Sequence, residues 1–431
     1  MRLTKISVQN YKSLKAFDFA PEDMTVVVGA NAAGKSNFAD CIDFISEVYR
    51  HGLEVAIGRK GGYENIAFRK MRRSKQPVRV SLIAEFNADE IRYYTRRRKK
   101  PASGEVRFEH SFSFIAKGYS IRAEFEVADE EIRISRRTER DWVHLATIRR
   151  RDNSFSIDAD ENQRANDSEF DEQFTVKDLL VFRQHGELVA AKTELLITIL
   201  GRFLPLYSFA RGLEGIRVFQ ISPTKSREFG VPTPTPELGR TGGNLPAVID
   251  LMQKKHRQQW KLVLQTMRSI LPDLSAITVD YTSGRTLGLF FKEEGVGRPW
   301  SVDEVSDGTL QTLALLVALF DPESTALVLE EPENSVHPWI IRHIVDACRE
   351  ASARKQIMIT THSPIVINAV RPDQVWVLWR ADGESKIARM TEIDREFLPM
   401  WEHGEIPTFD YIDAGAVPQA LPPAPSESES A

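Results

Sequence analysis

The sequence predicts an α/β fold that includes an antiparallel β subdomain and a mainly helical insertion. Three observations support this prediction. Residues 24–28, MTVVV, form an apolar run that leads into a glycine-containing loop and then a helical pattern. Residues 78–160 alternate between apolar and polar side chains, which is typical of antiparallel strands. From residue 278 onward, apolar runs alternate with helical patterns, and this order predicts an α/β layer.

The N-terminal elements follow from hydrophobic periodicity. Residues 1–14 alternate as an edge strand does, and residues 24–28 are apolar enough for a buried strand. Residues 36–50 have the helical period, because their apolar side chains recur on one helix face. That face comprises Phe38, Cys41, Ile42, Ile45 and Val48. Short turn signals divide residues 78–160 into five strand-like runs, which predicts a meander.

The rest of the chain alternates between helical and strand-like runs. Helical patterns cover residues 175–205, 244–271, 308–320 and 339–352, and strands are expected at 276–283, 287–294, 326–331 and 356–362. We therefore expect an N-terminal lobe at 1–160, a mainly helical insertion at 161–275, a C-terminal lobe at 276–400 and a tail at 401–431. The end of the tail is rich in Pro, Ser and Glu, so we expect disorder from about residue 415.

The composition is that of a soluble globular chain long enough for two or three domains. Its 431 residues are 42% hydrophobic and 27% charged. The net charge of -4 does not by itself point to a polyanionic partner. Cys41 and Cys348 lie far apart without a metal-binding spacing, which predicts two reduced thiols. No run approaches the ~20 apolar residues of a membrane span, and the N-terminus lacks the apolar core of a secretion signal. These features predict a cytoplasmic protein without a membrane segment.

Positive charge is concentrated in one stretch. Residues Arg59–Lys100 contain fourteen Lys and Arg residues against four Asp and Glu residues, a net charge of +10. One interpretation is a face that follows a nucleic-acid backbone or binds an acidic partner protein. The other is a solvated loop around residues 95–100, and the sequence does not decide between the two.

A phosphate-binding loop follows the strand at 24–28. Residues 29–36, GANAAGKS, match the pattern G-x-x-x-x-G-K-[ST] between a strand and a helix. Backbone N–H groups and the helix N-terminus would hold the phosphates, Lys35 would charge-pair with the β- and γ-phosphates, and Ser36 would offer its hydroxyl to Mg²⁺. The alternative is an ordinary strand–turn–helix corner. The expected nucleotide-binding residues are Gly29, Ala30, Asn31, Ala32, Ala33, Gly34, Lys35, Ser36 and Asn37.

Two adjacent carboxylates end the strand at 326–331, ALVLEE. An acid at a strand end beside the phosphate loop is placed to organise Mg²⁺, and the next residue can orient the attacking water. We assign Glu330 to the metal and Glu331 to the water. An acidic pair after a strand is otherwise a solvated turn, so this assignment depends on the motifs that accompany it.

Two further motifs have a catalytic and an ordinary interpretation. His362 ends the strand in ITTHSP, where a histidine is commonly only a hydrogen-bonding group. Ser306, Asp307 and Gly308 begin the helical pattern in VSDGTLQ, where the serine is a normal N-cap. Each signal alone is weak, but their order and spacing together are specific.

The ordered set resembles the ABC-type ATPases of the RecF/SMC class. SDGTLQ corresponds to their signature motif, ALVLEEPE to the Walker B motif with its catalytic glutamate, and THSP to the switch histidine. Within that class, ISVQNYKSL, IRVFQISPTKSRE, GGNLPAVIDLM and LEEPENSVHP resemble OLD-type (overcoming-lysogenization-defect) ATPases over residues 1 to about 380. The resemblance implies a P-loop NTPase fold of the ABC type. Two residues depart from the common pattern: Glu330 replaces aspartate, and Ala32 replaces a glycine and would be strained if its φ is positive.

The resemblance implies an ATPase that uses ATP and Mg²⁺ and dimerises around the nucleotide. Lys35, Glu331 and His362 would be its catalytic residues, with His362 sensing the γ-phosphate. Ser306, Asp307 and Gly308 would contact ATP held by the other subunit of a homodimer. Lys12 is either near the nucleotide or simply solvated, and the glutamine loop of this class is not located from the sequence.

The resemblance also implies a separate output protein. Many OLD-type proteins carry a TOPRIM nuclease domain after the switch histidine, but residues 365–431 are too few for a typical domain of ~100 residues. We therefore expect an ATP-driven sensor or clamp for a separate effector, a nuclease being one candidate, in bacterial anti-phage defence or DNA repair. The alternatives are a nucleotide-binding subunit of a membrane transporter, which would have little use for the basic stretch, and an ATP-binding scaffold without turnover, against which Glu331 argues.

Overall fold

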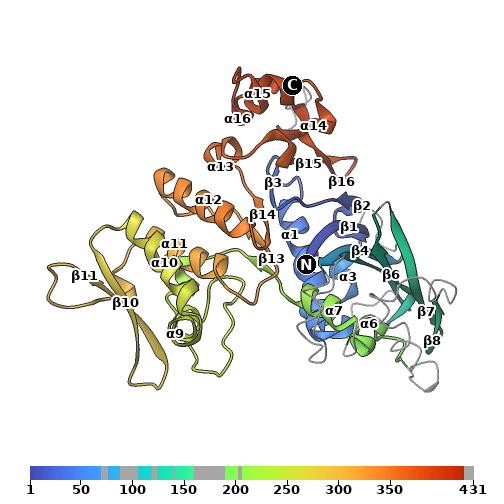
Figure 1. Ribbon diagram of the computed structural model, residues 1–431, viewed down its shortest axis with the longest axis horizontal. Coiled ribbons are helices and arrows are strands. Elements are labelled where there is room, and N and C mark those ends of the chain that lie inside the picture. The colour runs from blue at the N-terminus through green and yellow to red at the C-terminus, as the bar shows by residue number, and fades with distance from the viewer. Residues whose placement is uncertain are drawn as a thin grey trace, which may run out of the picture. The chain divides into compact units, whose positions relative to one another are not determined.

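The computed structural model describes residues 1–68, 76–87, 105–118, 124–139, 141–159, 190–201 and 206–421. The chain forms two compact units, each made of several segments. The first comprises Met1–Pro21, Asp40–Ile216 and Arg380–Ile387. The second comprises Glu22–Ala39, Arg217–Trp379 and Ala388–Ala431. Each unit has its own large sheet (Figure 1).

The first unit contains a seven-stranded antiparallel sheet in the order β2-β1-β4-β5-β6-β7-β8. Its strands are β1 (Arg2–Tyr11), β2 (Leu14–Phe19), β4 (Val78–Asn87), β5 (Glu105–Ala116), β6 (Phe125–Arg137), β7 (Trp142–Arg151) and β8 (Ser154–Ala159). The predicted meander is confirmed as β4 to β8, but the end of one expected run (125–127) and the whole of the next (131–137) form the single strand β6, and β8 was not among the expected runs. The prediction of an edge strand at the N-terminus is wrong, because β1 lies between β2 and β4. The turn at residues 12–13 folds β2 back along β1 and leaves β2 at the edge.

Aromatic side chains join helix α1 (Lys35–His51) to the sheet of the first unit. The Phe44 ring lies 5.4 Å from that of Tyr11 and 5.9 Å from that of Phe114, centroid to centroid. All five residues of the predicted apolar face of this helix are at most 1% exposed, so that expectation is confirmed. The other helices of this unit are α2 (Leu53–Arg59), α3 (Tyr63–Ile66), α6 (Leu196–Leu200) and α7 (Leu206–Glu214).

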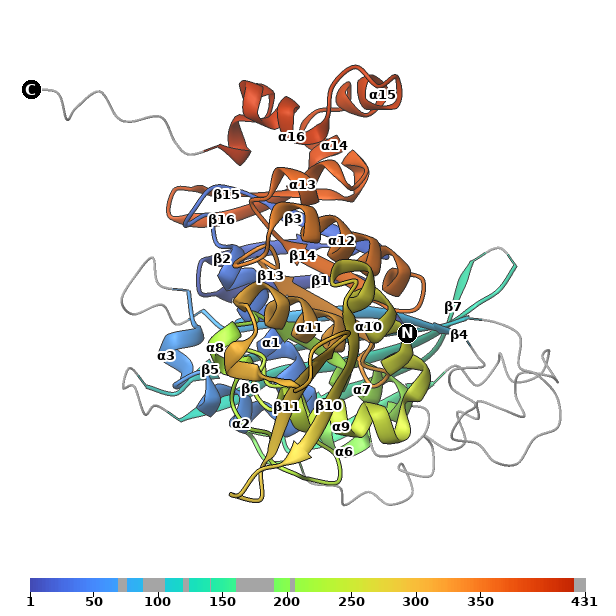
Figure 2. The same ribbon diagram turned by 90° about the vertical axis from the view of Figure 1, so that its left-hand side faces the viewer.

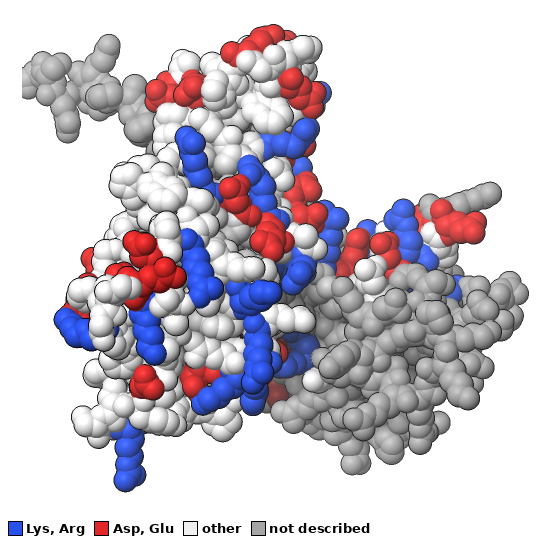
Figure 3. Space-filling view, turned by 60° about the vertical axis from the view of Figure 1, so that its left-hand side comes forward, with Lys and Arg blue, Asp and Glu red and all other residues white. Residues whose placement is uncertain are grey.

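Most of the basic residues of this stretch, eleven of fourteen, fall outside the described residues. Of its members that are described, Arg59 pairs with Glu47, and Lys60 pairs with both Asp40 and Asp43 at 2.7 and 2.6 Å. On the face shown in Figure 3, basic side chains of the described residues lie close to acidic ones. The nucleic-acid interpretation of Arg59–Lys100 therefore stays a prediction.

The second unit is built on a six-stranded sheet in the order β16-β15-β3-β14-β13-β9. These strands are β3 (Met24–Val28), β9 (Ile216–Phe219), β13 (Ala326–Glu330), β14 (Gln356–Thr360), β15 (Val375–Ala381) and β16 (Glu384–Arg389). The four strands β15, β3, β14 and β13 run parallel to one another, so their carboxyl ends meet at one edge. Each of β3, β13 and β14 is buried at every residue, as strands covered on both faces require.

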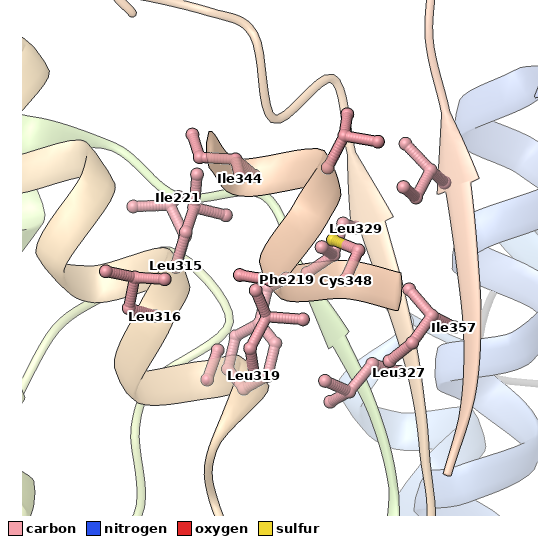
Figure 4. Close-up of a cluster of buried hydrophobic side chains, with 14 of the residues drawn as sticks. Phe219, Ile221, Leu315, Leu316, Leu319, Leu327, Leu329, Ile344, Cys348 and Ile357 are labelled. Atoms are coloured by element: carbon pink, nitrogen blue, oxygen red, sulfur yellow. The ribbon is translucent and has the colours of Figure 1, made fainter. Parts of the chain in front are cut away.

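Two helices cover the sheet of the second unit. They are α11 (Asp307–Leu319) and α12 (Pro338–Ser352). Leu315 and Leu319 of α11 lie among Ile344 and Cys348 of α12 and Leu327 of β13 (Figure 4). Nearly the whole of α11 is buried from Leu310 to Leu319, which explains why its sequence is apolar all round rather than amphipathic.

A helical region and a small sheet complete this unit. Helices α8 (Pro223–Ser226), α9 (Leu245–Lys255) and α10 (Arg257–Ile270) precede strands β10 (Leu274–Tyr281), β11 (Leu287–Glu293) and β12 (Trp300–Ser301). The sequence places two of these strands in the α/β layer, but they form a separate antiparallel sheet, β10-β11-β12, beside α9 and α10 (Figure 2). A short hairpin turn at residues 282–286 closes on itself through Thr282 and Thr286, so β11 pairs back on β10 instead of crossing over.

The C-terminal segment is ordered further than the sequence predicts. After α13 (Pro364–Asn368), α14 (Met390–Ile393), α15 (Phe397–Glu402) and α16 (Thr408–Tyr411), helical turns continue through Ala420. Ile412 and Val417 are 5% and 0% exposed and belong to the hydrophobic core. The sequence predicts disorder from about residue 415, whereas the chain is described as far as Leu421. Burial of Ile412 and Val417 in the core accounts for the difference.

Candidate nucleotide site

The phosphate loop joins β3 to α1, so it lies at the carboxyl edge of the parallel strands. Within it, the Nζ atom of Lys35 donates to the carbonyl oxygens of Gly29 and Ala30 at 2.8 and 3.3 Å. The Lys35 side chain thus curls back over its own loop. Lys35 is only 7% exposed, and a buried ammonium requires such acceptors when no phosphate supplies them.

The loop backbone has two restricted positions. A Cβ atom at Gly29 would lie 2.0 Å from the carbonyl oxygen of Leu378 in β15, so only glycine fits there. Ala32 adopts φ 61°, the left-handed region that alanine enters at a cost. The strain anticipated for Ala32 is therefore present. The other loop residues, Asn31, Ala33 and Gly34, complete a tight turn closed by the Ala33 N–H to Ala30 carbonyl bond.

The two glutamates at the end of β13 differ in their surroundings. Glu330 is 5% exposed, and its Oε1 atom accepts a hydrogen bond from Nη2 of Arg240 at 2.5 Å. Glu331 turns off the strand at φ 44°, and its N–H donates to the Thr360 carbonyl of β14 at 2.8 Å. Its side chain is about one third exposed, and Oε1 lies 3.7 Å from Nε2 of His362. Glu330 is therefore held inside, while Glu331 faces outward beside the histidine.

The electrostatics place Lys35, Glu331 and His362 in one neighbourhood. Burial lowers the pKa of Lys35, and the carboxylates of Glu331 and Glu333 oppose this shift. Burial also lowers the pKa of His362, the Lys35 ammonium lowers it further, and the same two carboxylates oppose the change. The imidazole is therefore neutral at pH 7, so one ring nitrogen can donate and the other can accept.

Glu333 is a site residue that the sequence reasoning missed. Its Oε1 atom accepts hydrogen bonds from Oγ1 of Thr361 at 2.6 Å and from the His362 N–H at 2.9 Å. Its Oε2 atom is buried without a hydrogen-bond partner among the described residues. Glu333 therefore fixes the backbone that carries His362. The available signal was a third carboxylate within LEEPE, separated from the assigned pair by Pro332 alone.

Gln220 and Arg240 were also missed. Gln220 follows β9, the strand next to β13, and its N–H donates to the Arg240 carbonyl oxygen at 2.9 Å. The Arg240 side chain in turn reaches Glu330. The signal for Gln220 was a glutamine directly after the apolar run IRVF. No comparable signal marked Arg240, because a single arginine in a glycine-rich loop indicates no partner.

The predicted signature residues lie at the start of α11. Ser306 is the N-cap, and its Oγ atom accepts a hydrogen bond from the Thr309 N–H at 3.2 Å. Asp307 pairs with Nη1 of Arg227 at 2.7 Å, and Nη2 of the same arginine donates to the Val305 carbonyl. A Cβ atom at Gly308 would lie 3.0 Å from the Ser335 carbonyl oxygen. Arg227 thus ties the segment after Gln220 to this helix terminus.

The role considered for Lys12 at the nucleotide stays a prediction. Its Nζ atom pairs with Oδ2 of Asp40 at 2.5 Å in the first unit. Lys12 adopts φ 47° in the turn between β1 and β2. Asp40 also accepts from Lys60 and from the Tyr11 hydroxyl, and these hydrogen bonds hold its pKa at about 2 against the opposing effect of burial.

The donor set fits a magnesium ion held jointly with a nucleotide. Ser36 lies in the first turn of α1 and is exposed, and Glu330 supplies a carboxylate at the end of β13, which is separated from β3 by β14. Hydroxyl and carboxylate oxygens are the ligands Mg²⁺ prefers, with phosphates and waters completing its shell. Within the described residues, no three or more His, Cys, Asp or Glu side chains gather as a complete metal site, which agrees with an ion that depends on phosphate oxygens. The arginine already paired with Glu330 shows that this carboxylate requires a cation.

The chain thus has an α/β P-loop fold like that of ABC-type ATPase heads, and it also contains a large antiparallel sheet. Residues 24–368 match the family described as "AAA domain, putative AbiEii toxin, Type IV TA system". The chain belongs to this family. In the part of the chain that the structure describes, no helix is both long and apolar enough to cross a bilayer.

Solved structures of SMC head domains are similar to this chain. An SMC head bound to the C-winged helix domain of ScpA aligns with a TM-score of 0.51 and 15% identity, covering 90% of this chain and 98% of that one. The SMC head domain from Thermotoga maritima aligns with a TM-score of 0.41 and 14% identity, covering 90% and 99%. At such low identity, the first likeness shows the fold alone.

Proposed function

We propose that this protein binds and hydrolyses ATP in a Mg²⁺-dependent reaction. One observation carries the proposal: Lys35, Glu331 and His362, from three separate segments, face one another at the carboxyl edge of β3, β13 and β14. Membership of the family supports an ATPase. The predicted nucleotide-binding residues, Gly29–Asn37, would supply backbone N–H groups and the charge of Lys35 to the phosphates.

Each catalytic side chain has a role that follows from its surroundings. Lys35 exchanges the carbonyls of Gly29 and Ala30 for phosphate oxygens, which are stronger acceptors for an ammonium. Glu331 orients the attacking water, because its carboxylate is the exposed member of the pair. Neutral His362 contacts the γ-phosphate through a ring N–H. Mg²⁺, held by Ser36 and Glu330, would neutralise charge that develops on the phosphates.

We further propose that ATP closes a homodimer. The chain has one phosphate loop and one signature, and Ser306, Asp307 and Gly308 would contact the nucleotide held by the other copy. The exposed side chains of Ser306 and Asp307 support this role. Gln220 is the candidate for the glutamine loop, since it follows the strand next to β13 and leads into the helical region.

The cellular role is proposed from the resemblance to OLD-type ATPases. The head would act as sensor or clamp for a separate effector, a nuclease being one candidate, in anti-phage defence or DNA repair. The family description names a putative toxin of a toxin–antitoxin system, which is compatible with defence. One SMC head is bound to a domain of ScpA, so a fold of this kind can hold a partner protein. Arg59–Lys100 is the candidate contact for nucleic acid or an acidic partner protein.

The first prediction tests hydrolysis. Purified wild-type chain should release phosphate from ATP only when Mg²⁺ is present. Lys35→Ala should lose nucleotide binding, because the buried cation is gone, and Glu331→Gln should bind ATP and retain it uncleaved. Lys261→Ala, which removes an exposed lysine from α10, is the matched control and should behave as wild type. Phosphate release and binding of a fluorescent ATP analogue are the measurements.

Two results would contradict this proposal. Absence of ATP binding by the wild type would remove the function altogether. Undiminished turnover by Glu331→Gln would show that another group orients the water. ATP binding without any turnover in the wild type would favour the scaffold interpretation.

A further inference from the structure

The carboxylate assigned to the metal already has a resident cation. Glu330 is 5% exposed, and its side chain alone is 3% exposed, so an unpaired negative charge there would be strongly unfavourable. Nη2 of Arg240 lies 2.5 Å from Oε1 of Glu330. The two residues are separated by 90 positions in the chain. The pair is therefore a product of the tertiary fold and not of local sequence.

The loop that presents Arg240 has a defined shape. The Gly239 N–H donates to the Gly243 carbonyl, and the Gly242 N–H donates back to the Gly239 carbonyl, at 2.9 and 2.8 Å. Gly242 has φ 89°, and a Cβ atom there would lie 2.3 Å from Oγ of Ser226. Only glycine satisfies both conditions, so the loop is closed tightly around the arginine.

The same loop is bonded to the segment that follows β9. The Gln220 N–H donates to the Arg240 carbonyl, and the Ser222 N–H donates to the Thr241 carbonyl, both at 2.9 Å. On its other side, Asn244 precedes α9 directly and accepts from the Val231 N–H through Oδ1 at 2.9 Å. The backbone of Arg240 is thus held from both sides, whereas its guanidinium is one third exposed and ends on Glu330.

A guanidinium and Mg²⁺ that share one buried carboxylate repel each other, because both are cations held within a few ångströms in a site of low polarity. Mg²⁺ additionally demands near-octahedral oxygen ligands. Entry of the ion must therefore weaken or displace the Arg240 contact. The energy of that contact is subtracted from the affinity of the site for Mg²⁺.

We propose that Arg240 is a positioning residue that holds the Glu330 carboxylate in the nucleotide-free protein and competes with Mg²⁺ for it. This proposal rests on the proposed function, since it assigns Glu330 to the metal. Arg240 sets the Mg²⁺ concentration at which ATP binds tightly. It also stabilises the protein only while the metal is absent. Between turnovers Arg240 thereby supplies a positive charge to the buried Glu330 carboxylate.

The experiment compares Arg240→Met, Arg240→Lys and wild type, each in the Glu331→Gln background of the full chain. A fluorescent ATP analogue is bound at increasing free Mg²⁺, starting from EDTA, and thermal unfolding is recorded without ligand and with Mg²⁺ and ATP. Arg349→Met is the matched control, because Arg349 pairs with Asp346 at 2.9 Å on helix α12.

In Arg240→Met we expect the half-saturating Mg²⁺ concentration to fall by about tenfold or more, because removal of a competing buried ion pair is worth at least one such factor. The ligand-free melting temperature should fall, and the gain on adding Mg²⁺ and ATP should exceed that of wild type. Arg240→Lys should lie between the two, since it keeps the charge without the planar fork. Arg349→Met should leave the Mg²⁺ dependence unchanged.

The inference is overturned if the Mg²⁺ half-point of Arg240→Met or Arg240→Lys stays within twofold of wild type while ATP is still bound. If Arg240→Met does not fold, Arg240→Lys decides alone, because it changes the same contact without removing the charge. Failure of the proposed function has a different signature, namely that the Glu331→Gln background binds no ATP at any Mg²⁺ concentration.

Discussion

Two residues of the candidate site adopt backbone conformations that their side chains disfavour. Ala32 in the phosphate loop has φ 61°, and Glu331 after β13 has φ 44°. Such conformations cost on the order of 1–3 kcal/mol each and persist where the surrounding structure imposes them. For Glu331 the imposing contact is the bond from its N–H to the Thr360 carbonyl. The strain turns the second glutamate away from the strand and beside His362.

The strain at Ala32 leads to the second prediction. Ala32→Gly should raise the free energy of unfolding by about 1 kcal/mol, because glycine enters the left-handed region without a steric cost. Denaturant unfolding of the nucleotide-free chain measures this. Ala39→Gly in the interior of α1 is the control and should lower the stability by about 1 kcal/mol or more. Equal destabilisation by both substitutions would contradict the strain at Ala32.

The third prediction concerns the protonation of His362. The pKa of His362 should lie below its ordinary value of 6.5. It should rise in Lys35→Ala, which removes a cation, and fall further in Glu331→Gln, which removes an anion. Histidine NMR titration measures each value, and the missing signal in His362→Gln identifies the resonance. A pKa that moved in the same direction in both variants would disprove the shared electrostatics.

The sign of the accompanying stability effect follows from the same shift. Between the depressed folded-state pKa and 6.5, the folded chain binds fewer protons at His362 than the unfolded chain does. The contribution of this residue to the free energy of unfolding is therefore complete above pH 6.5. It is lost as the pH falls through the folded-state pKa.

At the scale of elements, the first turn of α11 contains both an N-cap hydrogen bond and an ion pair. Ser306 caps the helix by accepting from the Thr309 N–H, and Arg227 neutralises Asp307. From Leu310 onward the helix is core, with Leu313 and Leu316 fully buried. The predicted signature residues, Ser306, Asp307 and Gly308, therefore lie at the start of a helix that is buried from Leu310 to Leu319. This burial restricts the movement of the helix terminus.

The fourth prediction separates the cap from the proposed contact in trans. Ser306→Ala should lower stability by about 1 kcal/mol, because the N-cap acceptor is lost. Ser306→Asp should keep the cap, since aspartate accepts the same hydrogen bond, but should abolish ATP-dependent dimerisation by repelling the γ-phosphate of the other subunit. Thermal unfolding and light scattering with ATP in the Glu331→Gln background report the two effects. Normal dimerisation by Ser306→Asp would argue against contact in trans.

At the scale of the whole molecule, the proposal of two composite sites leads to the fifth prediction. Lys35→Ala and Ser306→Asp should each be inactive alone. An equal mixture should regain up to about half of wild-type turnover, because neither variant closes a dimer with itself and each mixed dimer has one intact site of two. Phosphate release from the mixture, after allowing subunit exchange, measures this. A mixture as inactive as its parts would show that both motifs serve the same nucleotide.

The sequence by itself determined the α/β class and the chemistry of the phosphate loop. The runs at β3, β13 and β14 are continuous and apolar, so they could only be buried strands, and polar residues at their ends had to meet at one edge. The contacts among Lys35, Glu331 and His362 follow from that rule. These inferences depend on short-range periodicity and on the parallel direction of neighbouring strands, both of which a sequence contains.

Only the tertiary structure decided which distant segments complete the site. Arg240 on Glu330, Glu333 beneath the backbone of His362, and Gln220 beside the Arg240 loop are contacts between segments that no local pattern relates. The positive φ of Glu331 arises in the same way, from a bond to the neighbouring strand. The physical reason is that periodicity reports how each segment is buried, whereas the partner of a buried charge depends on how the whole chain packs.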